Sequence, residues 1–429
     1  MLKKLNIKSE FLKSVVVLMT GTVLAQVINV IMLPLLTRYF YSPEAFGEFN
    51  LYMRLVGFVS GIAAARFEMS LPLPNYDGHS YLLYRLSLRI ALISVSAMTL
   101  FGLVYIALDA SAVIDFTFLL LSIGSTVFVV FINLGTNWSI RKKTYQAISR
   151  QKVVGAISSN AFRILFGLIS FGSIGLILGT FIGYAISSYW YLRDYINLRS
   201  KVFYNYSRKK DKVLVREYRE FPLVNLPHVS LDLGRELLVA MFVAQYFGLE
   251  IFGWYSVSYT ILKMPIAIMG VSIGQVFYGR ASELANEGKS VFPLLRKTMI
   301  TLIALSVIPF TVVFFFGQPI FEFVLGANYA ESGRYSEIMA PWLMLLFLVS
   351  PTSNLSLVLR RQKEYFLLGI LNSTIQLVGF GVLPLVYGTT AEAWEQILFI
   401  ITIAMTINFV GVTGASLYFS KLGVKEKGK

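Results

Sequence analysis

The chain has 429 residues, of which 56% are hydrophobic and only 14% are charged, against roughly 25% charged residues in an ordinary soluble domain. Its mean hydropathy is +0.67, it contains no cysteine, and its formal net charge is +15. These values exclude a disordered chain, a disulfide scaffold and a cysteine-ligated metal protein. A soluble protein is also excluded, because 38 basic and 23 acidic residues cannot coat a chain of this length. The composition indicates a polytopic membrane protein.

Twelve apolar runs follow one another along the chain. A helix that crosses about 30 Å of hydrocarbon needs about 20 mostly apolar residues, and each of these runs is close to that length. They lie at 14–36, 47–65, 88–108, 116–140, 153–171, 174–192, 224–247, 252–278, 299–316, 337–359, 366–387 and 397–418. The sequence therefore predicts an all-α polytopic membrane protein with about 12 transmembrane helices.

The longest segment between two spans divides the chain into halves. This segment, 193–220, is basic and aromatic, and it predicts an amphipathic linker on the cytoplasmic membrane surface. Residues 1–192 then form an N-terminal six-helix bundle and residues 221–420 a C-terminal one, followed by a cytoplasmic tail at 421–429. Two such bundles are expected to surround a central cavity.

The basic residues are distributed very unevenly between the two sides of the predicted membrane. Residues at the first two positions of a span are counted with the adjacent loop, as Arg89 is. Of the 38 Lys and Arg, 32 then lie in the two tails and the even-numbered loops, two lie in the odd-numbered loops, and four lie deeper inside spans. Because basic residues favour the cytoplasmic side, both termini are expected to be cytoplasmic. Most of the positive charge is thus a topology signal. Nucleic-acid binding is not expected, since no folded basic domain is present to carry it.

A short motif occurs once in each half. Glu44-Ala-Phe-Gly-Glu-Phe49 and Glu250-Ile-Phe-Gly-Trp-Tyr255 match with an offset of 206 residues. One interpretation is an internal repeat, whose halves run in the same sense because each has six spans, with a binding cavity between them. The other is two similar turns at the aromatic belt of the membrane.

Charged residues inside spans are the best candidates for a binding site. Each costs on the order of 2.5–3.5 kcal/mol to insert and usually faces a water-filled cavity. Helix rise places three of the basic residues near the membrane midplane and Arg54 nearer the outer face. The candidate cationic cavity consists of Arg54, Arg163, Arg235 and Lys263. The alternative for each is a side chain that reaches the interface or forms a structural ion pair.

The seventh span combines acidic and basic residues. Asp232, Arg235 and Glu236 lie at i, i+3 and i+4 spacing, which places them on neighbouring faces of a helix. They form either a self-neutralising structural pair or an ion site, in which Asp232 and Glu236 are the candidates for coupling to H⁺ or Na⁺. Together the interior charges sum to +2, which favours an anionic ligand.

No set of residues predicts an enzyme. Gly288-Lys289-Ser290 is a fragment of a phosphate-binding loop, but Glu283 stands where that motif requires glycine. The sequence contains no cysteine and only two widely separated histidines. We expect no catalytic residues, no cofactor and no metal.

Several stretches resemble the bacterial O-antigen flippases (Wzx), in order and spacing over the whole chain. In the first half they are Phe11-Leu-Lys13, Thr20-Gly-Thr22, Ala25-Gln26, Pro34, Thr37-Arg38, Ser42-Pro-Glu44, Phe46-Gly47, Ala65-Arg-Phe-Glu68 and Leu73-Pro74. In the second half they are Gly253-Trp-Tyr255, Pro265, Ile273-Gly-Gln-Val-Phe277, Arg280 and Glu283. These flippases belong to the multidrug/oligosaccharidyl-lipid/polysaccharide flippase superfamily.

The resemblance implies two six-helix bundles around a cationic cavity and a role in surface polysaccharide synthesis. The implied substrate is an undecaprenyl-pyrophosphate-linked oligosaccharide, moved by alternating access to the periplasmic leaflet of the inner membrane. Intramembrane arginines are a shared feature of such flippases, and Arg54 is the residue of this chain to which the resemblance first assigns that role. Membrane lipids, H⁺ or Na⁺, and the polysaccharide polymerase and chain-length machinery are the expected partners. A multidrug-type cation antiporter and a membrane polysaccharide polymerase or acyltransferase remain alternatives.

Overall fold

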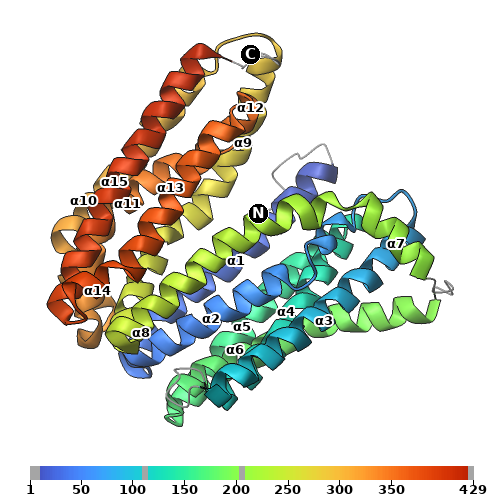
Figure 1. Cartoon of the computed structure of the whole chain (residues 1–429), viewed down its shortest axis with the longest axis horizontal. Helices are drawn as coiled ribbons and strands as arrows, with labels where there is room; N and C mark the ends of the chain where they lie inside the picture. The colour runs from blue at the N-terminus through green and yellow to red at the C-terminus, as the bar shows by residue number, and fades with distance from the viewer. Residues whose placement is uncertain (1–9, 109–114, 202–207, 424–429) are drawn as a thin grey trace. The chain divides into compact units, whose positions relative to one another are not determined.

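The computed structural model describes residues 10–108, 115–201 and 208–423, and all regular structure in these ranges is helical (Figure 1). The predicted all-α fold is confirmed. The main helices of the first half are α1 (Glu10–Tyr39), α2 (Pro43–Ile62), α3 (Asp77–Leu108), α4 (Phe116–Arg141), α5 (Tyr145–Leu168), α6 (Gly172–Lys201) and α7 (Arg208–Glu217). Those of the second half are α8 (Leu226–Pro265), α9 (Val271–Asn286), α10 (Phe292–Leu325), α11 (Ala330–Val349), α12 (Leu355–Val358), α13 (Gln362–Gly381), α14 (Leu383–Tyr387) and α15 (Ala391–Leu422).

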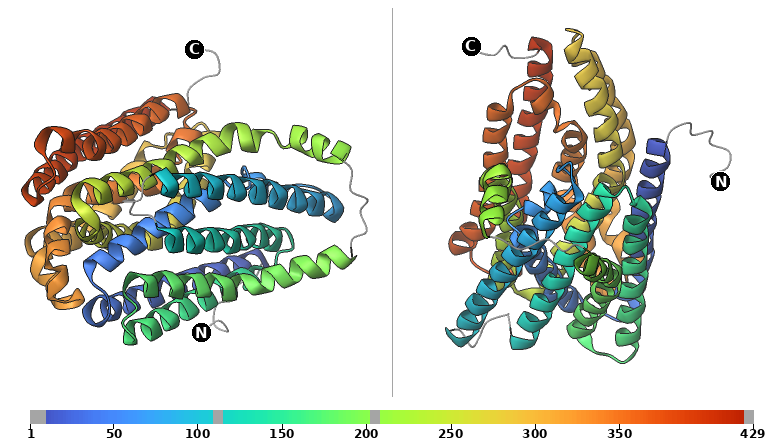
Figure 2. Two further views of the ribbon diagram at one scale, coloured as in Figure 1. Left: turned by 60° about the horizontal axis from the view of Figure 1, so that its bottom comes forward. Right: turned by 90° about the vertical axis from the view of Figure 1, so that its right-hand side faces the viewer.

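The helices form two compact units. The first comprises residues 1–41 and 48–237, and the second comprises residues 42–47 and 238–429. The division therefore falls inside α8, and the first turn of α2 belongs to the second unit. In the first unit, α1 to α6 run alongside one another (Figures 1 and 2).

Within the described ranges, eight segments are long and apolar enough to cross a membrane, and the chain is a multi-pass membrane protein. They are Val17–Tyr39, Asp77–Leu108, Phe116–Arg141, Gly172–Asn197, Phe221–Gly270, Phe292–Leu325, Gln362–Tyr387 and Ala391–Leu422. The 50-residue segment covers the predicted span 224–247 and most of the span 252–278, and its backbone leaves the helical region between them at Gly248 (φ 86°, ψ 167°). The more polar helices α2, α5 and α11 overlap the remaining three predicted spans.

Several helices extend beyond the apolar runs from which they were predicted. α3 begins at Asp77 rather than 88, α5 begins at Tyr145 rather than 153, and α6 continues to Lys201 rather than 192. Hydropathy detects only the part of a helix that lies in hydrocarbon, whereas backbone hydrogen bonding continues into the polar interface. Lys152, which the apolar run excluded, consequently lies inside α5.

The predicted linker at 193–220 continues α6 and then forms the short helix α7. Leu214 of α7 is only 5% exposed and belongs to the apolar core that includes Tyr84 and Leu134. Arg89 of α3 donates a hydrogen bond of 3.0 Å to the Asp211 carboxylate. α7 therefore packs against α3. Residues 1–9, 202–207 of the linker and 424–429 of the tail lie outside the described residues.

The two copies of the repeated motif contact each other in a reciprocal manner. A Cβ at Gly47 would lie 1.9 Å from the carbonyl oxygen of Leu249, and a Cβ at Gly253 would lie 1.8 Å from that of Pro43. Each glycine thus meets the carbonyl four residues before the other glycine. This exchange is what a twofold relation between the copies requires, and it favours an internal repeat over two similar aromatic turns.

Gly47→Ala and Gly253→Ala are each expected to lower the thermal unfolding midpoint of the purified protein. The added Cβ would force two backbones apart, and overpacking of this kind costs about 1–3 kcal/mol. Thermal unfolding in detergent, followed by size-exclusion chromatography, measures the loss. Gly57→Ala is the matched control on α2, because a Cβ there meets no atom within 4 Å. Equal midpoints for all three variants would contradict the close contact.

Candidate functional site

Arg163 is the centre of a polar cluster in the first unit. It lies on α5, and its guanidinium donates to the Thr180 hydroxyl of α6 from Nε at 3.1 Å and from Nη2 at 2.7 Å. Nη1 lies 3.4 Å from Oδ1 of Asn160. The guanidinium carbon is 4.7 Å from the centre of the Phe49 ring, which is a cation–π distance.

Small residues allow the helices to approach closely at this cluster. A Cβ at Gly179 of α6 would lie 2.7 Å from the backbone nitrogen and from Cγ of Arg163. The Tyr41 hydroxyl donates to the Arg163 carbonyl at 2.6 Å. Asn160, which is 3% exposed, donates to Oδ1 of Asn29 on α1 at 2.8 Å. α1, α2, α5 and α6 thus all contribute to holding the arginine in place.

The partners of the Arg163 guanidinium are electrically neutral. Within the described part of the chain it contacts a hydroxyl, an amide and an aromatic ring, and it contacts no carboxylate. Neutral dipoles orient a cation without cancelling its charge. Arg163 therefore keeps a positive charge and a planar donor set that suit a phosphate or carboxylate.

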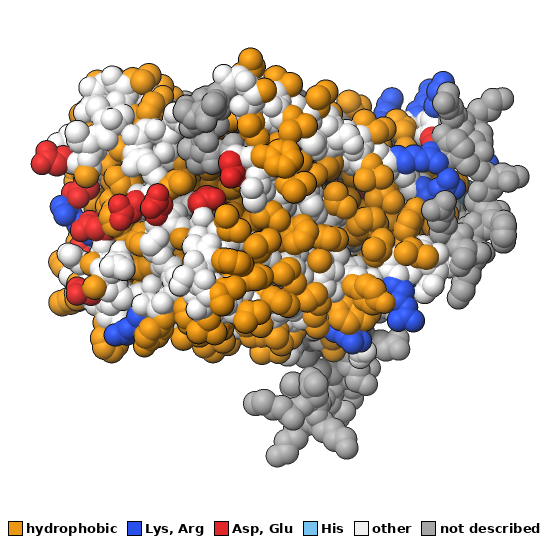
Figure 3. Space-filling model, turned by 90° about the horizontal axis from the view of Figure 1, so that it is seen from below, with side chains coloured by type: hydrophobic (Ala, Val, Ile, Leu, Met, Phe, Trp, Pro, Cys, Tyr) orange, Lys and Arg blue, Asp and Glu red, His pale blue; other side chains and the backbone are white. Residues whose placement is uncertain are grey.

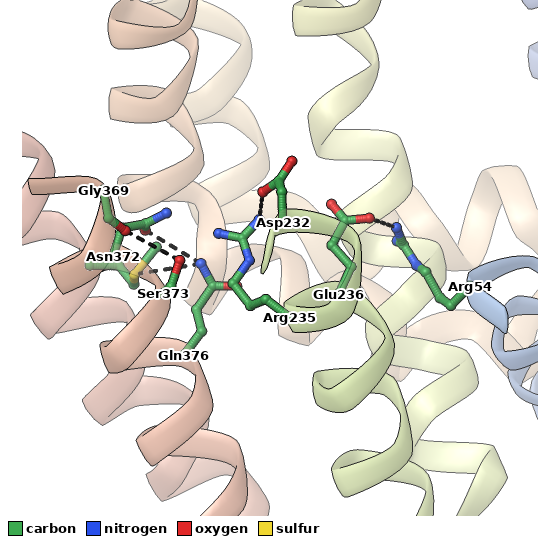
Figure 4. A network of polar contacts seen from close by, with 9 residues as sticks. Arg54, Asp232, Arg235, Glu236, Gly369, Asn372, Ser373 and Gln376 are labelled. Carbon is green, nitrogen blue, oxygen red and sulfur yellow. Dashed lines mark hydrogen bonds and ion pairs between the residues drawn. The ribbon is translucent and has the colours of Figure 1, made fainter. Parts of the chain in front are cut away.

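The charged residues of α8 form ion pairs instead. Arg54 of α2 donates to the Glu236 carboxylate, and Arg235 donates to Asp232 at 2.8 Å (Figure 4). Arg235 and Glu236 leave the helix in different directions (Figure 4). The Asp232 side chain is 62% exposed, whereas that of Arg235 is only 10% exposed. Both candidates for ion coupling are thus held by arginines.

The four predicted site cations are divided between the two units. Arg54, Arg163 and Arg235 belong to the first unit, whereas Lys263 belongs to the second. The Lys263 ammonium lies 4.7 Å from the centre of the Tyr259 ring. Arg54 and Arg235 are paired with carboxylates, whereas the contacts of the Arg163 guanidinium among the described residues are neutral.

The depths inferred from the apolar runs change with the true helix bounds. Arg163 lies five residues before the end of α5 at Leu168, or about 7.5 Å, and not at the middle of the helix. Arg54 is eleven residues, or about 16 Å, from the start of α2 at Pro43. It is therefore central in its helix.

Sequence reasoning missed the neutral residues of the cluster. Asn29, Asn160 and Thr180 lie in mostly apolar runs, where single polar residues are common. The only local signal was the i, i+3 spacing of Asn160 and Arg163 on one helix face. Asn29 and Thr180 had no such signal, because their partners are distant in sequence.

The motif at Ala65–Glu68 forms a strained turn after α2. Ala65 and Arg66 both adopt left-handed backbone conformations, with φ of 48° and 64°. Arg66 lies 3.4 Å from the Glu68 carboxylate, which is buried, and burial raises the pKa of Glu68. The motif found by resemblance thus fixes the direction in which the chain leaves α2.

Solved structures with a similar fold are membrane transporters. Lipid II flippase MurJ in an inward closed conformation superposes with a TM-score of 0.72 at 13% identity, over 96% of this chain and 88% of that one. An inward-facing multidrug resistance MATE family transporter of the MOP superfamily gives 0.64 at 16% identity, over 94% and 96%. A MOP superfamily transporter from Pyrococcus furiosus gives 0.55 at 15% identity, over 95% and 96%. The chain therefore has the fold of MOP superfamily transporters.

The family follows from a match at the sequence level. A family model described as polysaccharide biosynthesis protein matches residues 35–334, and the chain belongs to this family. No curated protein sequence matches it significantly. The resemblance to the O-antigen flippases and their superfamily is confirmed at the level of family and fold. These comparisons point to transporters and flippases rather than enzymes.

The pair of Arg54 and Glu236 is expected to show energetic coupling. Arg54→Gln and Glu236→Gln should each lower the unfolding midpoint, because each leaves a partly buried charge without its partner. The double variant should lose less than the sum, by about 1 kcal/mol. Thermal unfolding of the four proteins measures this. The exposed ion pair of Arg280 and Glu283, with an N–O distance of 2.6 Å, is the control and should show no measurable coupling energy. Additive losses for the Arg54 and Glu236 variants would contradict an ion pair between these two residues.

Proposed function

We propose that this protein is a flippase for an undecaprenyl-pyrophosphate-linked oligosaccharide, an O-antigen or related repeat unit. It moves this lipid from the cytoplasmic to the periplasmic leaflet of the bacterial inner membrane by alternating access. The observation that carries the proposal is Arg163, a cation within a membrane bundle whose contacts are all neutral. Membership of the polysaccharide biosynthesis family supports the glycan class.

The chemistry of Arg163 suits a pyrophosphate group. The guanidinium fork binds phosphate oxygens with two parallel hydrogen bonds, and such charge-assisted bonds strengthen in a site of low dielectric constant. Asn29 of α1 and Tyr184 of α6 offer amide and hydroxyl groups to sugar hydroxyls in the same unit. The prenyl chain needs no polar site, because it remains in lipid throughout the cycle.

The proposed orientation rests on charge. Figure 3 shows a face covered mostly by apolar side chains, and most Lys and Arg lie in the two tails and the even-numbered loops of the sequence. Because basic residues favour the cytoplasmic side, the amino-terminal end of α5 is cytoplasmic and Arg163 lies toward the periplasm. Both termini are then cytoplasmic. In this orientation we expect any contacts with the polysaccharide polymerase and chain-length machinery on the periplasmic side.

Ion coupling is assigned to the pairs on α8. Protonation or Na⁺ binding at Glu236 would weaken its bond to Arg54, and the same applies to Asp232 and Arg235. Each event would release an arginine that is otherwise neutralised. The ion gradient would thereby set how much positive charge Arg54 and Arg235 present to the substrate.

The second candidate is a multidrug-type cation antiporter, which the MATE fold suggests. A cationic drug requires surplus acidic charge in the membrane interior. In this chain both interior acids are paired with arginines, and the remaining surplus is basic. An enzyme such as a polymerase or acyltransferase is less favoured, since the described residues bring no catalytic group together with Arg163.

A chromosomal deletion tests the proposed function. The deletion strain should accumulate a completed lipid-linked repeat unit and lose surface polysaccharide, because the glycan is built but not moved. Analysis of extracted lipid-linked glycans by mass spectrometry, beside immunoblots of surface polysaccharide, measures both effects. Normal surface polysaccharide in the deletion strain would exclude the flippase.

Arg163→Gln should abolish complementation of the deletion, whereas Arg163→Lys should retain part of it. Glutamine keeps hydrogen-bond donors but removes the charge, and lysine keeps the charge without the planar fork. Surface polysaccharide at equal membrane levels of each variant is the measurement. Arg216→Gln, on the exposed side of α7, is the control and should behave as wild type. Full activity of Arg163→Gln would remove the arginine from the site.

A further inference from the structure

Lys152 is a second basic residue of α5 whose contacts are neutral. It lies seven residues after the start of the helix at Tyr145, and it is half-buried. Its ammonium donates to the Thr22 hydroxyl of α1 at 2.9 Å. Within the described part of the chain no carboxylate contacts it. Lys152 thus resembles Arg163 in its chemistry.

Lys152 and Arg163 lie on the same face of α5. Eleven residues separate them, which is three helical turns and about 16 Å. Asn160 lies between them on that face. On α1, Thr22 and Asn29 are two turns apart and bond to Lys152 and Asn160 respectively. Polar groups therefore continue along the interface of α1 and α5 from one cation to the other.

α1 and α5 are in close contact where this row begins. A Cβ at Gly21 would lie 1.9 Å from the Ser149 hydroxyl oxygen. A lysine placed at such a contact could be expected to point away toward water. The Lys152 ammonium instead donates to the Thr22 hydroxyl of α1, so its charge stays beside this helix contact.

We propose that Lys152 is a second phosphate-binding residue, which binds the pyrophosphate of the substrate before it reaches Arg163. This inference rests on the proposed function and adds a site to it. An anion that leaves water needs a counter-charge along its whole path, and Arg163 alone supplies one only near the far end of α5. Lys152 supplies a compact charge near the amino-terminal end, and the amide nitrogen of Asn29, whose oxygen accepts from Asn160, offers a donor in between.

A structural role for Lys152 makes a different prediction. If the lysine only ties α1 to α5 through Thr22, removing the Thr22 hydroxyl should have the same effect as removing the lysine. If it binds phosphate, Thr22→Val leaves the ammonium in place. The two variants together therefore separate the roles.

The experiment measures binding of geranylgeranyl pyrophosphate to the purified full-length protein in lipid nanodiscs. Lys152→Met should raise the Kd about tenfold or more, which corresponds to about 1.4 kcal/mol or more. Lys152→Arg should stay within about threefold of wild type, and so should Thr22→Val. Lys212→Met, on an exposed position of α7, should bind as wild type. Geranylgeraniol, which lacks the pyrophosphate, should not distinguish the variants.

Labelling of the wild-type protein provides a test that needs no variant to fold. Inorganic pyrophosphate should slow the reaction of Lys152 with an amine-directed reagent, measured by peptide mass spectrometry with Lys212 as the internal reference. Unchanged labelling at Lys152 would overturn the inference. Equal loss of binding in Thr22→Val and Lys152→Met would also overturn it.

The outcomes distinguish this inference from the proposed function. If Arg163→Gln loses geranylgeranyl pyrophosphate and Lys152→Met does not, Lys152 is not a binding residue and the flippase stands. If wild-type protein binds neither geranylgeranyl pyrophosphate nor inorganic pyrophosphate, the proposed function fails and the inference fails with it.

Discussion

The energetic cost of a charge in hydrocarbon governs the polar chemistry of this protein. A charged side chain at the centre of a membrane helix costs on the order of 2.5–3.5 kcal/mol, so each one requires a partner. The structure uses two kinds of partner. Arg54 and Arg235 bond to carboxylates, which cancels their charge, whereas Arg163 bonds to a hydroxyl and an amide, which only orients it. The second arrangement is the more costly one, and it is the one that leaves a charge for a ligand.

Close helix packing makes the neutral partners possible. A hydroxyl can reach a guanidinium only if the two backbones approach closely, and glycine permits this at Gly179 beside Arg163. The same holds one turn further along α6, where a Cβ at Gly183 would lie 1.9 Å from the Ser159 hydroxyl oxygen. Small residues at helix contacts are typical of membrane bundles, where no hydrophobic effect drives the helices together. Here the same packing also sets the distance between Arg163 and its donors and acceptors.

The sequence predicted the helices well because hydrophobic length is a local property. The two parts of α8 were anticipated as separate spans, and the break at Gly248 lies between them. Partners were not predicted, because they depend on contacts between distant residues. Arg54 and Glu236 are 182 residues apart, and nothing in either span indicates the other. Lys152 was missed for a different reason. The first two turns of α5 are polar, so the apolar run begins only at 153 and leaves Lys152 outside the predicted span.

The internal repeat and the charge distribution differ in a way that bears on function. The two copies of the motif share the reciprocal backbone contact of Gly47 and Gly253. The charges do not follow that relation: with the offset of 206 residues, Arg54 corresponds to Thr260. Backbone packing constrains both copies equally, because each glycine lies against a backbone carbonyl of the other copy. An interior charge is costly, and no packing contact requires it in both copies. Under the proposed function, the matched glycines would support the conformational cycle, and the unmatched cations of the first unit would select an anionic substrate.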